Sequence, residues 1–412
     1  MKKMKNTISY PGIIQLLFFV IFSCKGTNEQ QLATLPDNLL SDPAAKSSCV
    51  FMASDQNGIP AVSWVEENEG ADPKMFFAVW QEGTQKFGDK KEIPIPANVS
   101  IHEEGMPKIA FKADGTMLAT YESSTPSETK KRGISDLSFM ESHDGGYTWT
   151  TAKSVFRNKY DGSSPNFSGL NRLTDGEIGV AWLDNNPDPN VKSRPLMFAK
   201  TSKDGRFNDA VEVTSKSCEC CRIAVSGDQD GQILIAFRNL TDEEVRDISM
   251  SISADDGLSF SAPADLSQDH WIVDGCPHNG PALAVGNGKR YLSWFTGVEG
   301  KEGVYYAEFD KDGKNLRREL LSEDGQFAQI VMTADETPLI AFSEYYEKDE
   351  KTHMRINLAK PIDSGFKIIQ ISESDTDANH PVIQMLKDGS AIVGWSEDGK
   401  AVYKKVSLND FD

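Results

Sequence analysis

The feature that most constrains this chain is a short apolar strand ending in an aromatic residue, which recurs seven times. Successive terminal aromatics lie 48 to 61 residues apart. Nearly every copy follows a turn sequence such as Asp114-Gly115 or Asp388-Gly389, and another apolar strand precedes that turn. The seven terminal aromatics are Trp64, Tyr121, Trp182, Phe237, Trp294, Phe342 and Trp395.

A repeat of this length holds about four short strands, which is typical of one blade of a β-propeller. No amphipathic helical pattern in the sequence is long enough to compete with it. The sequence therefore predicts an all-β fold, a single β-propeller with seven four-stranded antiparallel blades. Six blades are the alternative, in case the first or the last repeat is only an extension.

The last repeat offers three strands, at residues 381–385, 391–395 and 401–406, before the chain stops. A ring that does not close would leave exposed strand edges. We therefore expect a strand from the N-terminal side of the chain to complete the last blade, with residues 31–40 as the candidate.

Residues 1–23 are interpreted as an export signal. Lys2, Lys3 and Lys5 give a basic start, residues 13–22 form an apolar core too short to span a bilayer, and Cys24 closes the segment. This pattern resembles a bacterial lipoprotein signal, which implies cleavage before Cys24 and lipidation of its thiol. An uncleaved anchor and an ordinary secretory signal are the alternatives, and all three imply export.

The lipoprotein interpretation places the chain in the bacterial cell envelope, on the periplasmic or the surface face of the outer membrane. Residues 24–48 are then the lipidated cysteine and a polar tether, and residues 49–412 are the single propeller domain. The formal net charge of −19 argues against nucleic acid as a partner, because such a surface repels phosphates. Contact with the membrane is expected only through the N-terminal lipid.

Two predicted hairpins carry a family resemblance. Residues 142–149 read Ser-His-Asp-Gly-Gly-Tyr-Thr-Trp and residues 253–260 read Ser-Ala-Asp-Asp-Gly-Leu-Ser-Phe, with a shortened copy at 202–207 and a degenerate one at 310–313. They resemble the Asp-box, or BNR repeat, of sialidase-type propellers. Asp and Gly suit the tight turn, and the hydroxyls can satisfy its backbone. The resemblance implies the fold but not the chemistry.

The catalytic set that this resemblance implies is matched only in part. Sialidases hold the substrate carboxylate with three arginines, the first in an Arg-Ile-Pro motif on the opening blade. Here the first arginine of the mature chain is Arg132, and Gly58 precedes Ile59-Pro60. Lysine cannot make the two parallel hydrogen bonds by which an arginine guanidinium binds a carboxylate, so true sialidase activity is not expected.

Glycoside hydrolysis of the two-carboxylate kind stays open. The family uses a Tyr–Glu nucleophile pair and an aspartic acid/base. Carried over to this chain, these roles fall to Glu344 with Tyr346 and to Asp184.

Propeller connectivity predicts where further side chains converge. Residues just after the aromatic of strand two and just before strand one should line the same mouth of the central channel, which is the default ligand site. The first class includes Glu66, Glu122 and Arg238, and the second includes Arg222, His102 and His380. The four ligand-binding candidates for a carbohydrate or another small molecule are Glu66, Glu122, Arg222 and Arg238.

The second class also contains four of the six cysteines, namely Cys218, Cys220, Cys221 and Cys276. Because exported proteins seldom keep idle thiols, these cysteines need a chemical explanation. One hypothesis is a disulfide from Cys218 or Cys221 to Cys276, with the Cys-x-Cys-Cys segment extended as a strand so that alternate side chains face opposite sides.

The other hypothesis is a Cu(I) or Zn(II) site. Its ligands would be Cys218, Cys220, Cys276 and His278, with His102 or His380 nearby, although the spacing matches no standard zinc module. Since residues 218–222 and 274–278 open neighbouring repeats, both hypotheses expect these segments to lie side by side. Two function classes follow: a carbohydrate-binding propeller with or without hydrolase activity, and a metal-binding or redox lipoprotein.

Overall fold

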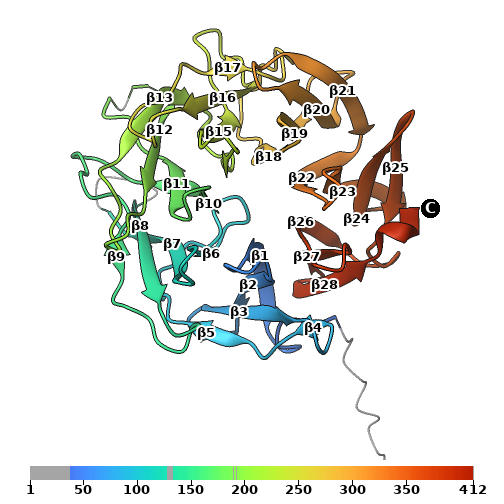
Figure 1. Ribbon diagram of the computed structural model, residues 1–412, viewed down its shortest axis with the longest axis horizontal. Coiled ribbons are helices and arrows are strands. Elements are labelled where there is room, and N and C mark those ends of the chain that lie inside the picture. Colours follow the sequence, from blue (N-terminus) through green and yellow to red (C-terminus); the bar gives the residue numbers. More distant parts are fainter. Residues whose placement is uncertain (1–37, 128–132, 189, 192, 412) are drawn as a thin grey trace, which may run out of the picture. The chain divides into compact units, whose positions relative to one another are not determined.

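The computed structural model describes residues 38–411 apart from 128–132, 189 and 192. In the compact unit that begins at Asp37, seven antiparallel sheets follow one another around a central channel (Figure 1). Helix in the described residues is limited to the 3-10 turn η1 (Leu408–Phe411). The predicted seven-bladed β-propeller is therefore confirmed, and the six-bladed alternative is wrong.

The first three blades contain the following strands. Blade one holds β1 (Lys46–Ser54), β2 (Pro60–Glu67), β3 (Lys74–Gln81), β4 (Lys86–Phe87) and β5 (Lys91–Ile93). Blade two holds β6 (Lys108–Phe111), β7 (Met117–Thr125), β8 (Ile134–Ser142) and β9 (Lys153–Ser154). Blade three holds β10 (Asn166–Arg172), β11 (Ile178–Leu183), β12 (Arg194–Lys200) and β13 (Val211–Ser217).

The remaining blades follow the same order. Blade four holds β14 (Ala224–Gly227), β15 (Ile233–Arg238), β16 (Ile248–Ser253) and β17 (Ala264–Asp265). Blade five holds β18 (Ala282–Gly286), β19 (Lys289–Thr296), β20 (Gly303–Asp310) and β21 (Asn315–Ser322). Blade six holds β22 (Gly325–Met332), β23 (Pro338–Lys348), β24 (Lys351–Ile362) and β25 (Gly365–Gln370), and blade seven β26 (Ala378–Met385), β27 (Ala391–Glu397) and β28 (Lys400–Val406).

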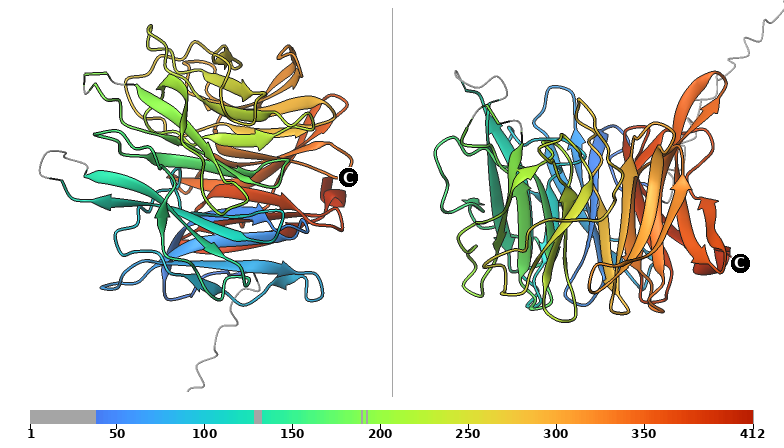
Figure 2. Two further views of the ribbon diagram at one scale, coloured as in Figure 1. Left: turned by 60° about the vertical axis from the view of Figure 1, so that its left-hand side comes forward. Right: turned by 90° about the horizontal axis from the view of Figure 1, so that it is seen from above.

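The second strand of each blade is apolar along most of its length because neighbouring blades cover both of its faces. Every residue of β11 and of β15 is buried. The first strands surround the channel and contact one another in order, with β26 returning to β1. Figure 2 shows the strands running between two faces, so the loops gather at either end of the channel.

Blade seven is completed from the N-terminal side of the chain. Leu39 pairs with Val402 in an antiparallel bridge, the Leu40 amide donates to the Ala401 carbonyl at 2.9 Å, and the Tyr403 amide donates to the Asn38 carbonyl at 3.0 Å. This confirms the predicted closure by an N-terminal strand. Residues 31–37 of the candidate strand lie outside the described residues.

The Asp-box hairpins form as their sequences predict. In the first, Asp144 accepts hydrogen bonds from the amide and the hydroxyl of Thr148 at 2.9 and 2.6 Å, and the Gly146 amide donates to the Ser142 hydroxyl at 2.8 Å. The second hairpin repeats these contacts with Asp255, Ser259, Gly257 and Ser253. The hairpins follow the third strands β8 and β16, so they lie on the face opposite the start of the first strands.

The predicted signal segment 1–23 and the lipidation site Cys24 lie outside the described residues. Within the described part of the chain, no helix has the length and apolar character that a membrane crossing requires.

The closure of blade seven gives a first prediction. Leu39 and Leu40 pack against the buried clusters on either side of β28. Replacing both with aspartate should lower the free energy of unfolding by about 2 to 4 kcal/mol, because burial of each leucine is lost and charge enters the core. Thermal unfolding of the full chain measures the effect.

Asn38→Asp is the matched control, because Asn38 holds β28 through its main-chain carbonyl. It should unfold at nearly the wild-type temperature. A wild-type melting temperature for the double leucine variant would show that the N-terminal strand does not close the ring in solution.

Candidate functional site at the channel mouth

Five of the seven blades enter the channel with the same irregularity. One residue just before or within the first strand has a positive φ of 49 to 59°, although none of the five is glycine. In β1, β10, β22 and β26 the pairing register shifts across this residue, as expected of a β-bulge. The five residues are Cys49, Phe167, His278, Phe327 and His380.

These bulges bring rings from distant blades together. The ring of His278 from blade five lies 5.0 Å from that of His102 from blade two and 6.1 Å from that of Phe167 from blade three, between centroids. The ring of His380 stacks on Phe327 at 3.9 Å. A left-handed residue other than glycine costs on the order of 1 kcal/mol, so the repeated use of this conformation marks the mouth as a special surface.

A buried ion pair links four blades beneath these rings. The Glu104 carboxylate accepts hydrogen bonds from Nη1 and the main-chain amide of Arg222, each at 3.0 Å, and from the Gly280 amide at 3.0 Å. Arg222 also donates to the Ala328 carbonyl of blade six. A Cβ at Gly280 would lie 2.2 Å from the Arg222 carbonyl oxygen, so only glycine fits there. Arg222, predicted as a ligand-binding residue, thus holds a neighbouring carboxylate.

The channel below the ion pair contains a cavity of about 520 Å³. Its wall is formed mainly by the first strands, and the charged residues on it are Glu104, Lys108, Arg172 and Arg222. Arg172 donates to the carbonyls of Asp55 and Phe111, and Lys108 to that of Met106, so these cations are engaged with the backbone.

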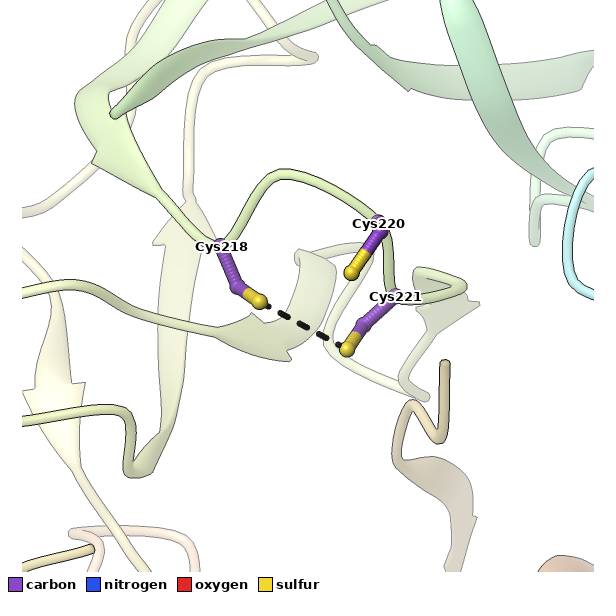
Figure 3. A group of neighbouring side chains, drawn as sticks. All are labelled: Cys218, Cys220 and Cys221. Carbon is purple, nitrogen blue, oxygen red and sulfur yellow. Dashed lines mark hydrogen bonds between the residues drawn. The ribbon is translucent and has the colours of Figure 1, made fainter. Parts of the chain in front are cut away.

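The cysteines form a second cluster at the mouth. The sulfurs of Cys218, Cys220 and Cys221 lie within 4.8 Å of one another, and Sγ of Cys218 is 3.7 Å from Sγ of Cys221 (Figure 3). Ligand atoms of Cys276 and His278, from blade five, lie within 4.8 Å of Cys220 Sγ and of each other. Residues 218–222 and 274–278 therefore meet, as the repeat predicts. The five described cysteines form no disulfide.

The local conformation of the Cys-x-Cys-Cys segment differs from the expected strand. β13 ends at Ser217 and β14 begins at Ala224, with a bend at Glu219 and Cys220 between them. An extended segment would have directed Cys221 away from Cys218 and Cys220. The bend instead turns all three thiols into one buried space, because the chain must reverse its course from one blade to the next.

Two buried arginines lie against this cluster. Nη1 of Arg246 donates to Sγ of Cys218 at 3.2 Å. The neighbouring thiols of Cys220 and Cys221, followed by Arg238 and Arg246, lower the pKa of Cys218. Hydrogen bonding to Cys218 raises the pKa of Cys220, and burial raises that of Cys221 to about 12. Of the three thiols, Cys218 is the one that loses its proton most readily.

The three predicted mouth histidines differ in their surroundings. Nδ1 of His102 accepts the Glu104 amide at 3.1 Å, and burial followed by the proximity of His278 lowers the pKa of His102. Burial lowers the pKa of His380 to about 4, and its ring lies on Phe327. Nδ1 of His278 is buried and finds no hydrogen-bond partner among the described residues. Nδ1 of His278 is therefore available to a ligand.

The acids predicted to line the mouth from strand two are held by hydrogen bonds and ion pairs with other groups of the protein. Glu66 accepts the Trp64 indole at 2.9 Å and pairs with Lys90 at 2.6 Å. Glu122 accepts the amide and hydroxyl of Ser168 at 2.9 and 3.1 Å, and burial raises the pKa of this carboxyl.

The other strand-two candidates have comparable partners. Asp184 accepts the amides of Ser164 and Asn185 and the Ser163 hydroxyl at 2.6 to 2.8 Å. Glu344 accepts from Ser322, Arg355 and Asn357 at 2.6 to 2.8 Å. The hydroxyl of Tyr346 donates to the Ser374 carbonyl at 2.8 Å, and Arg238 donates to the carbonyls of Arg246, Asn279 and Phe295. All of these side chains tie strands and loops together.

The comparisons with known proteins agree with this architecture. The model of the BNR repeat-like domain matches residues 65–285, more than half of the chain, so the protein belongs to that family and is a sialidase-like β-propeller. Among solved structures, the polysaccharide lyase Uly1 is 10% identical with a TM-score of 0.56, over 92% of this chain and 94% of that one.

The intramolecular trans-sialidase from Ruminococcus gnavus is 9% identical with a TM-score of 0.50, over 89% of this chain and 95% of that one. No curated protein matches the sequence. At such identities the solved structures establish the fold alone.

Two adjacent glutamates at the mouth give opposite predictions. Glu103 accepts the Cys49 amide at 3.1 Å through Oε1, while its buried Oε2 finds no partner among the described residues. Burial raises the pKa of Glu103 from 4.5 to about 7. Folding therefore favours the protonated carboxyl of Glu103. The contribution of this carboxyl to the free energy of unfolding is fully present below pH 4.5 and is lost as the pH rises through about 7.

Glu103→Gln removes this loss, so it should raise the free energy of unfolding by about 1 to 3 kcal/mol at about pH 8 and by little at about pH 4. Glu104→Gln should lower it by about 3 to 5 kcal/mol, because Arg222 is left as a buried charge without its carboxylate. Urea unfolding at the two pH values measures both. If the two substitutions changed the free energy of unfolding equally at about pH 8, the ionised Glu103 would not be the destabilising carboxylate and Glu104 the stabilising one, and the prediction would be wrong.

Proposed function

We propose that the mouth of this sialidase-like propeller binds a soft metal ion, Cu(I) or Zn(II), through Cys220, Cys276 and His278, with Cys218 and Cys221 beside them. The observation that carries this proposal is the convergence, within 4.8 Å, of ligand atoms from two different blades. Thiolate and imidazole are the donors that these two ions prefer.

The surroundings of the cluster suit a metal better than free thiols. Cys218, Cys220 and Cys221 are each at most 3% exposed, and two arginines accompany them, so negative charge on sulfur is compensated there. Nδ1 of His278 has no hydrogen-bond partner among the described residues. Cys276 is exposed and gives an ion a route to the buried thiols. A metal would replace the thiol protons, which leave to solvent.

The proposal includes export and attachment to the cell envelope through a lipid on Cys24. Its support is the sequence pattern of residues 1–24. In an oxidising compartment, thiols persist mainly as disulfides or as metal ligands. Export therefore makes a metal, rather than protons, the natural partner of a cluster of reduced cysteines.

Carbohydrate binding at the same mouth is the second candidate function. The rings of His102, Phe167, Phe327 and His380 favour it, since sugars stack on flat rings, and so does the family. Its hydrolytic version has less support, because Asp184, Glu344 and Tyr346 all hold structural hydrogen bonds.

Metal retention tests the first candidate. The full chain is purified in detergent under anaerobic conditions, exposed to Cu(I) or Zn(II), desalted and measured by elemental analysis. We expect the wild type to retain metal and Cys220→Ser to lose it. Cys49→Ser is the matched control, because Cys49 is also a buried thiol but packs away from the cluster, with Val65 of blade one and Met106 just before blade two. A metal-free wild type with a Cys218–Cys221 or Cys220–Cys276 disulfide would contradict the proposal.

Sialic acid release is a separate expectation. The first blade carries no arginine, Arg222 is paired with Glu104, and Arg238 donates to three carbonyls, so these two guanidiniums are not free for a substrate carboxylate. We expect the protein to leave aryl sialosides and sialylated glycans intact. Turnover that disappears in Arg222→Ala would mean that the arginine set has been rebuilt from other blades.

A further inference from the structure

We propose that the cysteine cluster holds two Cu(I) ions that share the Cys220 thiolate. The inner ion is bound by Cys218, Cys220 and Cys221, and the outer ion by Cys220, Cys276 and His278. This inference rests on the proposed metal-binding function and adds to it the number of ions, the metal and the role of one bridging ligand.

The grouping of the ligand atoms carries the inference. Among the described residues they fall into two triads, each with all atoms within 4.8 Å, and Cys220 belongs to both. Cys276 and His278 do not join Cys218 and Cys221 in one group. A structural zinc ion needs four protein ligands around one point, each about 2.0 to 2.3 Å from the metal. The two triads do not provide four ligand atoms around one point.

The inner triad is shielded from bulk solvent. Cys218 is 1% exposed, and Cys220 and Cys221 are 3% exposed. Among the described residues this triad offers a metal three sulfur ligands. Cu(I) accepts such a set readily because it is soft and favours low coordination numbers with thiolates. The distance of 3.7 Å between Cys218 and Cys221 Sγ already suits two ligands of one ion.

Charge also favours two ions. With both bound, Cys218, Cys220, Cys221 and Cys276 are thiolates, and their protons leave to solvent while no electron is transferred. Two Cu(I) ions neutralise half of this negative charge. The rest is opposed by Arg246, which donates to Cys218 Sγ at 3.2 Å, and by Arg238, which is 1% exposed and acts on Cys218 and Cys221.

The position of the triads sets the order of loading. Cys276 is exposed, and the inner cysteines are buried behind Cys220. An ion reaches the outer site first and passes to the inner site through the thiolate that both sites share. The outer site is then refilled from solvent.

The test is titration of the reduced full chain with Cu(I) in competition with the chromophoric chelator bicinchoninate. We expect two ions per wild-type chain and two per Cys49→Ser chain. Cys276→Ser and His278→Ala should each bind one ion, because the inner triad survives. Cys221→Ser should also bind one, held by the outer triad, and Cys220→Ser should bind neither tightly.

Cys276 and His278 lie in a loop before β18, so their variants are the ones expected to fold normally, as thermal unfolding can verify. One ion per wild-type chain, lost in both Cys276→Ser and Cys221→Ser, would overturn the two-ion arrangement and leave the proposed function intact. Two ions in Cys276→Ser would remove Cys276 from the site. No Cu(I) in any chain would contradict the proposed function itself.

Discussion

Closure of the ring is the constraint on which the rest of this structure depends. The second strands are apolar on both faces, and they are stable only while a blade covers each face. The pairing of Leu39 with Val402 provides the last strand. Because the ring is closed, the seven first strands all begin at one mouth, and loops far apart in the sequence meet there. The mouth is thus a consequence of the same pairing that stabilises the blades.

Two kinds of interaction then shape the mouth. The Glu104 carboxylate collects Arg222 from blade four and the Gly280 amide from blade five, and this holds the two segments side by side. The left-handed residues at the first strands direct rings and His278 over the channel. The segment before blade four consequently presents the cysteine sulfurs of residues 218–221 to the segment before blade five, which presents the sulfur of Cys276 and the imidazole of His278. The proposed soft-metal site uses this alignment and needs no change of the blades themselves.

The sequence predicted the features that depend on repetition. The spacing of the terminal aromatics gave seven blades, the missing strand of the last repeat pointed to residues near Leu39, and the Asp-box residues identified their hairpins. The meeting of Cys220 with Cys276 and His278 could also be predicted, since both segments precede first strands of neighbouring blades. Each of these depends on the position of a residue within the repeat, which the sequence displays directly.

The features that depend on local backbone geometry could not be predicted in the same way. The bend at Cys220 lies in the link between β13 and β14, and the positive φ of Phe167, Phe327 and His380 lies at bulges within first strands; strand periodicity has no rule for either. Phe167 and Phe327 were missed, although an aromatic near the start of an apolar strand could have drawn attention to them. Arg246 was missed because it enters from the loop before β16, a class of position not considered for the mouth. The positions of the strand-two acids Glu66 and Asp184 in the repeat could be predicted, but partners such as Lys90 and Ser164 lie in other segments, which the repeat does not place beside them.

X-ray absorption spectroscopy of the copper-loaded full chain tests the central claim of a Cys/His metal site most directly. The account predicts mainly sulfur scatterers at about 2.2 to 2.3 Å with a minor imidazole contribution, and loss of the imidazole signal in His278→Ala. A first shell of only nitrogen and oxygen, unchanged in Cys220→Ser, would show that copper binds elsewhere on the surface and would contradict the account.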